Sequence, residues 1–175
     1  LDIGIVRRMA ELRPHYQFVM IGPTVKIDPA SLPRGPNIHW LGGKEYAELP
    51  SYLSCLDVGF MPFALNEATR FISPTKTPEF LAAGLPVVST AIVDVARTWG
   101  AWGLVEIAGD ANEAAQAVDR LLARSDEDAA SWLAIVDQKL SSTSWDATWT
   151  KMLEHMRASS PPPTREKATE QVSHP

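Results

Sequence analysis

The stretch FISPTKTPEFLAAGLPVVST, residues 71–90, joins a loop, a helix and a strand in one short segment. The helix is predicted to begin at Pro74 or at Thr77 and to end at Ala83, with Gly84 after it in a left-handed conformation. The β-branched run that follows is typical of a buried strand. Because α/β proteins often hold phosphate groups where a loop enters a helix beside such a strand, the stretch suggests an α/β fold with an anion site.

Strand-like and helical patterns alternate along the rest of the sequence. Runs of strand formers occupy residues 16–23, 37–43, 57–62 and 104–108, and helical patterns lie between them and from 110 to 156. Such alternation predicts an α/β fold: a Rossmann-like, doubly wound parallel sheet of about five strands flanked by helices. Ligands of these sheets bind beyond the carboxyl ends of the strands, so the loops that follow the predicted strands form the candidate site.

The composition favours a globular protein without a membrane span. The 175 residues are 45% hydrophobic and 21% charged, and no apolar run approaches the length needed to cross a bilayer. The net charge of −5 argues against nucleic acid as a partner, although a local basic pocket can still bind an anion. With a single cysteine, Cys55, no internal disulfide can form, and we expect a cytoplasmic location, including peripheral attachment at the inner face of the membrane.

Neither a metal nor a cofactor is expected. The four histidines are scattered, none has metal-ligand spacing to another, and a single cysteine excludes a multi-cysteine zinc site. The sequence also lacks the Gly-x-Ser-x-Gly, Walker and Gly-x-Gly-x-x-Gly motifs. Their absence argues against hydrolase, nucleotidase and dehydrogenase functions.

Lys76 and Glu79 are the residues of the opening stretch best suited to a ligand. If Ser73 caps the helix and Pro74 is its first residue, both side chains project from one side. Lys76 would then meet a diphosphate at the helix start, and Glu79 would accept hydrogen bonds from ribose hydroxyls. The alternative is an ordinary surface ion pair worth about 0.2–0.5 kcal/mol. Spacing alone favours this alternative.

Several segments together resemble the C-terminal domain of family-4-type, retaining GT-B glycosyltransferases. The likeness covers about residues 1–157 and is carried by VMIGP, NIHWLGG, LPSYLSCLDVGFMPF, SPTKTPEFLAAGLPVVST and SWDATWTKML. It implies one Rossmann-like half of a GT-B fold, which binds a nucleoside diphosphate sugar as donor substrate without a metal. In that family the acceptor, here expected to be a saccharide or glycan precursor, is mostly held by an N-terminal domain, which the matching segments do not include.

The resemblance also assigns roles within the donor site. Lys76 is similar to the cation that contacts the diphosphate and is the expected catalytic residue, while Glu79 is similar to the second glutamate of a Glu-x7-Glu element, which binds ribose. By the same resemblance, Ser73, Pro74 and Thr75 would form a turn that faces the phosphates. Gly22 would let the donor approach the backbone, and Trp40, Leu41 and Gly42 would border the nucleobase.

The sequence departs from this family pattern at Phe71, where the first glutamate of the Glu-x7-Glu element should stand. The nearest carboxylate before it is Glu67, which we therefore place in the catalytic site, with Arg70 beside it in contact with the donor. Asn66 and Thr69 are alternatives for the same task, and each of the four could equally be an ordinary loop residue. Pro78 is a second departure, because it removes a hydrogen bond from a helix that begins at Pro74.

Two functional hypotheses follow. The first is the donor-binding domain of a hexosyltransferase-type enzyme, at residues 1–157 and truncated at its N-terminus, which transfers a sugar with retention and is inactive without its N-terminal partner domain. The second is a non-catalytic module that binds nucleotide sugars or serves as a scaffold. Residues 158–175 are predicted to be a disordered tail, because they contain three consecutive prolines and little to bury.

Overall fold

The computed structural model describes residues 1–25, 27–143 and 145–159. It contains two compact units, one from Leu1 to Leu140 and one that begins at Ser141. Helix α7 (Trp145–Ser159) belongs to the second unit. The predicted disordered tail lies outside the described residues from position 160 onward, and the predicted domain end at residue 157 remains a prediction.

The first unit contains five short parallel strands. They are β1 (Phe18–Ile21), β2 (Ile38–Gly42), β3 (Gly59–Met61), β4 (Val87–Thr90) and β5 (Val105–Ala108). The predicted α/β class and parallel pairing are confirmed, but the prediction of one continuous sheet is wrong. β1 pairs only with β2, while β3, β4 and β5 form a second sheet in that order. Among the described residues no strand pairs with the other edge of β1 or of β3.

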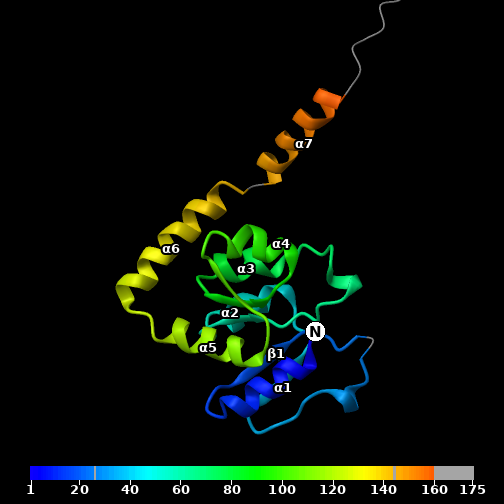
Figure 1. The fold of residues 1–175 in the computed structure, drawn as a ribbon, viewed down its shortest axis with the longest axis vertical. Coiled ribbons are helices and arrows are strands. Elements are labelled where there is room, and N and C mark those ends of the chain that lie inside the picture. The colour runs from blue at the N-terminus through cyan, green and yellow to red at the C-terminus, as the bar shows by residue number, and fades with distance from the viewer. Residues whose placement is uncertain (26, 144, 160–175) are drawn as a thin grey trace, which may run out of the picture. The chain divides into compact units, whose positions relative to one another are not determined.

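Helices connect the strands and cover them. They are α1 (Ile3–Leu12), α2 (Leu49–Leu53), α3 (Lys76–Ala82), α4 (Val93–Val95), α5 (Ala111–Leu122) and α6 (Asp126–Ser141), with a π-helical turn at Ala96–Gly100. α1 packs against α5, and Figure 1 shows these two helices on the opposite side of the strands from α3 and α4. The arrangement is that of a doubly wound α/β layer.

Two apolar clusters hold these layers together. Successive side chains of a strand point to opposite faces, so Val88 joins the cluster under α1 and α5 while Val87 joins the one under α3, α4 and α6. Val136 of α6 is fully buried in the second cluster, with Trp132 partly buried beside it. α6 therefore belongs to the fold of the first unit through its first three turns.

Polar side chains fix the connection from α1 to β1. Asn37, only 5% exposed, donates from Nδ2 to the carbonyl oxygens of Ala10 and Tyr16, each at 3.1 Å. On α5, Asp119 forms an ion pair with Arg13 and accepts a hydrogen bond from the Tyr16 hydroxyl at 2.7 Å. These bonds from Arg13 and Tyr16 lower the pKa of Asp119 to about 2.

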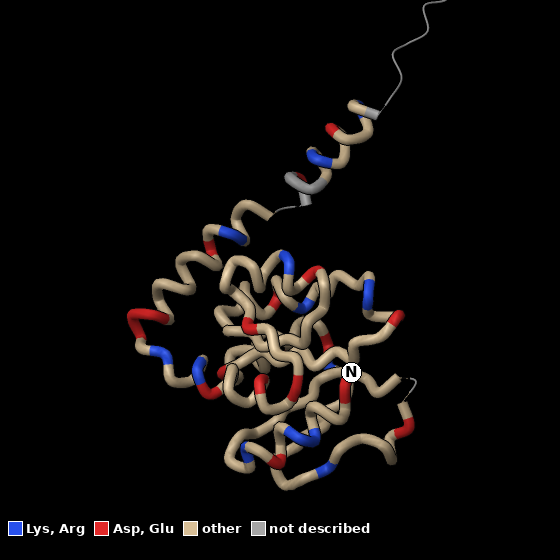
Figure 2. The backbone as a smooth tube through the Cα atoms, viewed as in Figure 1, with Lys and Arg blue, Asp and Glu red and all other residues tan. Residues whose placement is uncertain are grey.

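Charged residues of both signs are spread over the described fold, as Figure 2 shows. No helix among the described residues is both long enough and apolar enough to cross a bilayer.

Candidate functional site

Two loops meet beyond the carboxyl ends of β3 and β4. The Thr90 hydroxyl, at the end of β4, donates to the carbonyl oxygen of Phe63 at 2.9 Å and accepts from its amide at 3.1 Å. The Ser73 hydroxyl donates to a carboxylate oxygen of Asp94, in the first turn of α4, at 2.5 Å. The loop from β3 to α3 is therefore held against the segment that follows β4, as expected for a site at the carboxyl edge of a parallel sheet.

Helix α3 begins at Lys76, between the two predicted starts. Thr75 occupies the cap position without a side-chain hydrogen bond, so the assignment of Ser73 as cap and Pro74 as first residue is wrong. Pro78 is the third helical residue, and the first four amides of a helix have no partner within it. Pro78 therefore removes no helical hydrogen bond at this start. Gly84 has a φ of 76°, as predicted for the residue after the helix.

Lys76 and Glu79 lie next to each other on the exposed side of α3. The Lys76 ammonium is 2.6 Å from a Glu79 carboxylate oxygen, and the two side chains are 53% and 37% exposed. On the other side of the helix Thr77 and Leu81 are fully buried. The prediction that Lys76 and Glu79 lie on one side of the helix is confirmed. Their ion pair is also what the alternative of an ordinary surface pair expects.

The loop before α3 presents Glu67, Arg70 and Phe71. Asn66 caps the short helical turn Glu67–Thr69 by accepting from the Thr69 amide at 3.2 Å. Arg70 lies 3.3 Å from the Glu67 carboxylate and 5.2 Å from the centre of the Phe71 ring. Phe71, at the place of the expected family glutamate, is 84% exposed. The structure thus brings Glu67 and Arg70 together, and their exposure leaves them free to meet a ligand.

The remaining predicted donor contacts lie at the carboxyl end of the other sheet. Gly22 comes directly after β1, has a φ of 141° and donates its amide to the carbonyl oxygen of Gly42 at 2.9 Å. The Trp40 indole donates to the Pro33 carbonyl at 3.0 Å, and Leu41 is 39% exposed. The structure brings Gly22 and the end of β2 together, and their contact with a donor remains a prediction.

The predicted site is therefore divided between two sheets. The phosphate and ribose residues follow β3, Gly22 follows β1, the base-bordering residues lie at the end of β2, and no hydrogen bond or ion pair that the described residues form joins the two groups. Sequence reasoning missed Asp94, which orients Ser73. Its position in the first turn after a predicted strand end was the signal that could have found it. Within the described residues no cluster of three or more His, Cys, Asp or Glu side chains could hold a metal ion.

Comparison with known proteins decides the family. The model of the family "Glycosyl transferases group 1" matches residues 4–124, which include all five strands and both groups of candidate residues. The chain belongs to this family. The family resemblance seen in the sequence is thereby confirmed.

Two individual matches of this group 1 glycosyl transferase domain cover different shares of it. A Bacillus subtilis (strain 168) protein named "Putative teichuronic acid biosynthesis glycosyltransferase TuaH" is 33% identical over 100 residues, which are 55% of this chain and 25% of that protein. A match among solved structures is the C-terminal CMP-Kdo binding domain of WaaA from Acinetobacter baumannii, at 17% identity and a TM-score of 0.43. That comparison covers 79% of this chain and 99% of the WaaA domain.

Proposed function

We propose that this chain is the donor-binding half of a GT-B glycosyltransferase of the hexosyltransferase type, located in the cytoplasm or at the inner face of the membrane. It binds a nucleoside diphosphate sugar, and with an N-terminal partner domain transfers the sugar, with retention, to a saccharide or glycan precursor. Membership of the group 1 family supports the reaction class. The observation that carries the site is the exposed Lys76–Glu79 pair, beside loops that meet beyond β3 and β4.

The chemistry follows from charge. When the bond from the anomeric carbon to the diphosphate breaks, negative charge grows on the departing phosphate, and the acceptor hydroxyl gives its oxygen to the carbon and its proton to the leaving group. A fixed ammonium such as that of Lys76 stabilises this charge, which is the effect that electrostatic preorganisation serves best. Glu79 holds the ribose, Ser73, Pro74 and Thr75 form the turn around the phosphates, and Glu67 with Arg70 contacts the donor sugar.

Phe71 favours the second function, a module that binds nucleotide sugars without transferring them. An exposed ring stands where the family pattern has a carboxylate, so the usual contact to the donor sugar is missing. Reconstitution with an N-terminal domain separates the two functions, because only the enzyme gains transfer activity. For residues 1–175 alone we expect no transfer, since the family resemblance assigns the acceptor mostly to an N-terminal domain that the matching segments do not include.

Calorimetric titration of two variants tests the site, with the uridine, cytidine, adenosine and guanosine diphosphates and their nucleosides as ligands. Lys76→Ala should weaken binding of the preferred diphosphate by about 1.5–3 kcal/mol, the range for hydrogen bonds to charged groups, and leave nucleoside binding unchanged. Glu79→Ala should weaken nucleoside binding as well, because its partner is the ribose.

Arg8→Ala is the matched control, because Arg8 and Glu11 form an exposed pair of the same spacing at 3.0 Å on α1. It should change neither affinity. If Lys76→Ala and Glu79→Ala behave like this control with every ligand, the pair is an ordinary surface ion pair and the proposed donor site is wrong.

A further inference from the structure

The loop from β3 to α3 is fixed to the rest of the fold near both of its ends. Near its start, the Thr90 hydroxyl bonds the main chain of Phe63 twice, at 2.9 and 3.1 Å, and Thr90 is only 3% exposed. Near its end, the Ser73 hydroxyl donates to Asp94 at 2.5 Å. Thr90 is the last residue of β4 and Asp94 follows shortly after it, so both bonds hold the loop against the end of the neighbouring strand.

The middle of the loop is held by its own contacts. The Thr69 hydroxyl donates to the carbonyl oxygen of Ala64 at 2.6 Å, and the Thr69 amide donates to the Asn66 side chain at 3.2 Å. Ile72 is partly buried against the apolar cluster under α3 and α4. These contacts end at Ile72, directly before the turn that the proposed function assigns to the phosphates.

That turn, residues 73–75, depends on Asp94 for its place. Within the described part of the chain, the bond from Ser73 to Asp94 is the one hydrogen bond by which the turn reaches a segment other than α3. Pro74 has no amide to donate, and its carbonyl oxygen accepts from the Thr77 amide, inside α3, at 3.4 Å. Without Asp94 the turn would be joined to the fold only through the chain on either side of it.

The backbone around Asp94 is fixed by buried neighbours. Ile92 and Val95 are each 1% exposed, and the Ile92 amide donates to the carbonyl oxygen of Thr90 at 2.7 Å. Asp94 lies between them in the first turn of α4 and is itself exposed. A short side chain on a fixed backbone reaches few positions, so Asp94 offers Ser73 an acceptor at a defined place.

The direction of this bond decides what Ser73 can do for an anion. A hydroxyl has one proton, and Ser73 donates it to Asp94. Its remaining lone pairs repel a phosphate oxygen, and the Asp94 carboxylate is negative as well. The Ser73 side chain is therefore not the group that binds the phosphate. It acts on the main chain of the turn and, through it, on Lys76, which begins α3.

We propose that Asp94 is a positioning residue of the donor site: it holds Ser73 and thereby fixes the turn and Lys76 before the diphosphate arrives. The inference rests on the proposed function, because it concerns the same site. A turn that is already in place loses less conformational freedom when a ligand binds, which raises the affinity. The gain applies to the diphosphate, which the turn and Lys76 meet, and not to the nucleoside alone.

Calorimetric titration of two variants tests this role, with the preferred nucleoside diphosphate and its nucleoside as ligands. Asp94→Ala removes the acceptor and should weaken diphosphate binding about three- to tenfold, with nucleoside binding unchanged. Asp94→Asn keeps an acceptor oxygen and loses a negative charge, so it should bind the diphosphate at least as tightly as the natural chain. Unchanged or tighter diphosphate binding by Asp94→Ala would overturn the proposal, and the tighter binding would show that the carboxylate only repels phosphate.

A double-mutant cycle tests whether Asp94 acts through Ser73. Ser73→Ala removes the donor of the same bond, so the double variant should lose no more affinity for the diphosphate than either single variant. Losses that add would show that the two side chains act separately, against the proposal. The matched control is Asp128→Ala, which breaks an exposed serine–aspartate bond of 2.7 Å from Ser125 and should change neither affinity.

Trypsin tests the turn in the absence of a ligand. Arg70 and Lys76 are exposed cleavage residues on the two sides of the turn. Because cleavage requires the chain to open locally, Asp94→Ala should be cut there at least about threefold faster than the natural chain or Asp94→Asn. Ser73→Ala should be cut as fast as Asp94→Ala and gives the same test should Asp94→Ala fail to fold. Equal rates in all folded variants would mean that Asp94 does not hold the turn.

Lys76→Ala, measured beside these variants, separates this inference from the proposed function. Weaker diphosphate binding in Lys76→Ala but not in Asp94→Ala leaves the donor site in place and overturns only the positioning role. Unchanged binding in both variants means that the proposed donor site is wrong, and the role of Asp94 is then wrong with it.

Discussion

Asn37 shows how one buried amide can hold several segments in place. Its Nδ2 atom satisfies the carbonyl of Ala10, near the end of α1, and that of Tyr16, just before β1, while its own carbonyl accepts from the Phe18 amide. A helix end that is buried needs partners for its last carbonyls, because they have none within the helix. Asn37 supplies them from a position next to β2.

We predict that Asn37→Ala destabilises the fold by about 1–3 kcal/mol, the cost of leaving buried acceptors without donors. Urea unfolding followed by circular dichroism measures this loss. Gln116→Ala, on the exposed side of α5, is the control and should change stability by less than about 0.5 kcal/mol. A loss for Asn37→Ala no larger than that of the control would show that the three segments are held by packing alone.

Asp119 makes stability depend on pH. Hydrogen bonds from Arg13 and Tyr16 lower its pKa in the folded protein to about 2, below its ordinary value of 3.8. A carboxylate with a lowered folded pKa stabilises the fold above its unfolded pKa, and the effect is lost as pH falls through the folded pKa. The stability advantage of the natural chain over Asp119→Asn should thus be constant above about pH 4 and shrink toward pH 2.

The measurement is urea unfolding of both proteins between neutral pH and the lowest pH at which the fold survives. Glu11→Gln on the exposed face of α1 gives the baseline for acid effects that do not involve Asp119. An advantage of the natural chain that grows as the pH falls would contradict the assigned ionisation.

At the scale of the elements, a glycine in β3 allows α3 to pack against the sheet. A Cβ atom built on Gly59 would lie 2.8 Å from Cγ and Cδ2 of Phe80 and 3.2 Å from its Cβ. Gly59→Ala should therefore cost about 1–3 kcal/mol through overpacking. In a Phe80→Ala background the same change should cost much less, because the clashing ring atoms are gone.

This comparison is a double-mutant cycle, with free energies of unfolding as its readout. Strictly additive costs for Gly59→Ala and Phe80→Ala would show that β3 and α3 adjust independently. Gly43→Ala, where an added Cβ meets no atom within 4 Å, is a control for the general cost of replacing a glycine.

Local sequence signals predicted the elements well, and non-local pairing was the part that they missed. Hydrophobic periodicity and punctuation by residues such as Gly84 act within a few residues, so the positions of the strands and the end of α3 could be predicted. Separation of β1 from β3 depends on which strands find partners across long sequence distances. Neither Val19 nor Val58 carries any sign in the sequence that its outer edge lacks a partner.

The candidate site was predictable to the same extent. The i,i+3 spacing of Lys76 and Glu79 correctly placed them on one side of a helix. The assignment of Ser73 as helix cap was wrong because α3 begins at Lys76, two residues after the predicted Pro74, while the Ser73 hydroxyl donates to Asp94 from a segment beyond the next strand. A capping pattern states which bonds a side chain can make locally, and tertiary contacts decide which of them form.

At the scale of the whole first unit, the division into two sheets determines how the predicted donor site is assembled. The base residues move with β1 and β2, and Lys76 moves with β3 and α3. Among the described residues no backbone ladder joins β1 to β3, so strand pairing does not fix the spacing between the two sheets. A ligand that spans both groups requires this spacing to be constant.

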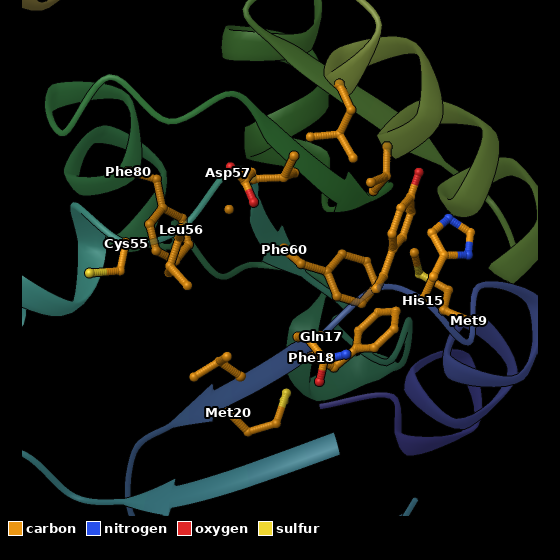
Figure 3. Close-up of a pocket in the computed structure, with 16 residues that line it drawn as sticks. Met9, His15, Gln17, Phe18, Met20, Cys55, Leu56, Asp57, Phe60 and Phe80 are labelled. Carbon is orange, nitrogen blue, oxygen red and sulfur yellow. The ribbon is translucent and has the colours of Figure 1, made fainter. Parts of the chain in front are cut away.

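Refolding should reveal the open edges in another way. The unpaired edges of β1 and β3 both line one cavity of about 440 Å³ (Figure 3), where they can accept an extended segment of an unfolded neighbour. Recovery of the chain from urea should therefore fall with protein concentration over a roughly hundredfold range in the micromolar region, with light scattering as the readout. Recovery that does not depend on protein concentration over this range would contradict the expectation.

The unpaired edges of β1 and β3 also affect what happens to each molecule while it folds among other copies. A copy that meets an unfolded neighbour before its own edges are paired can exchange segments with it, which is the route by which folding intermediates become entangled oligomers.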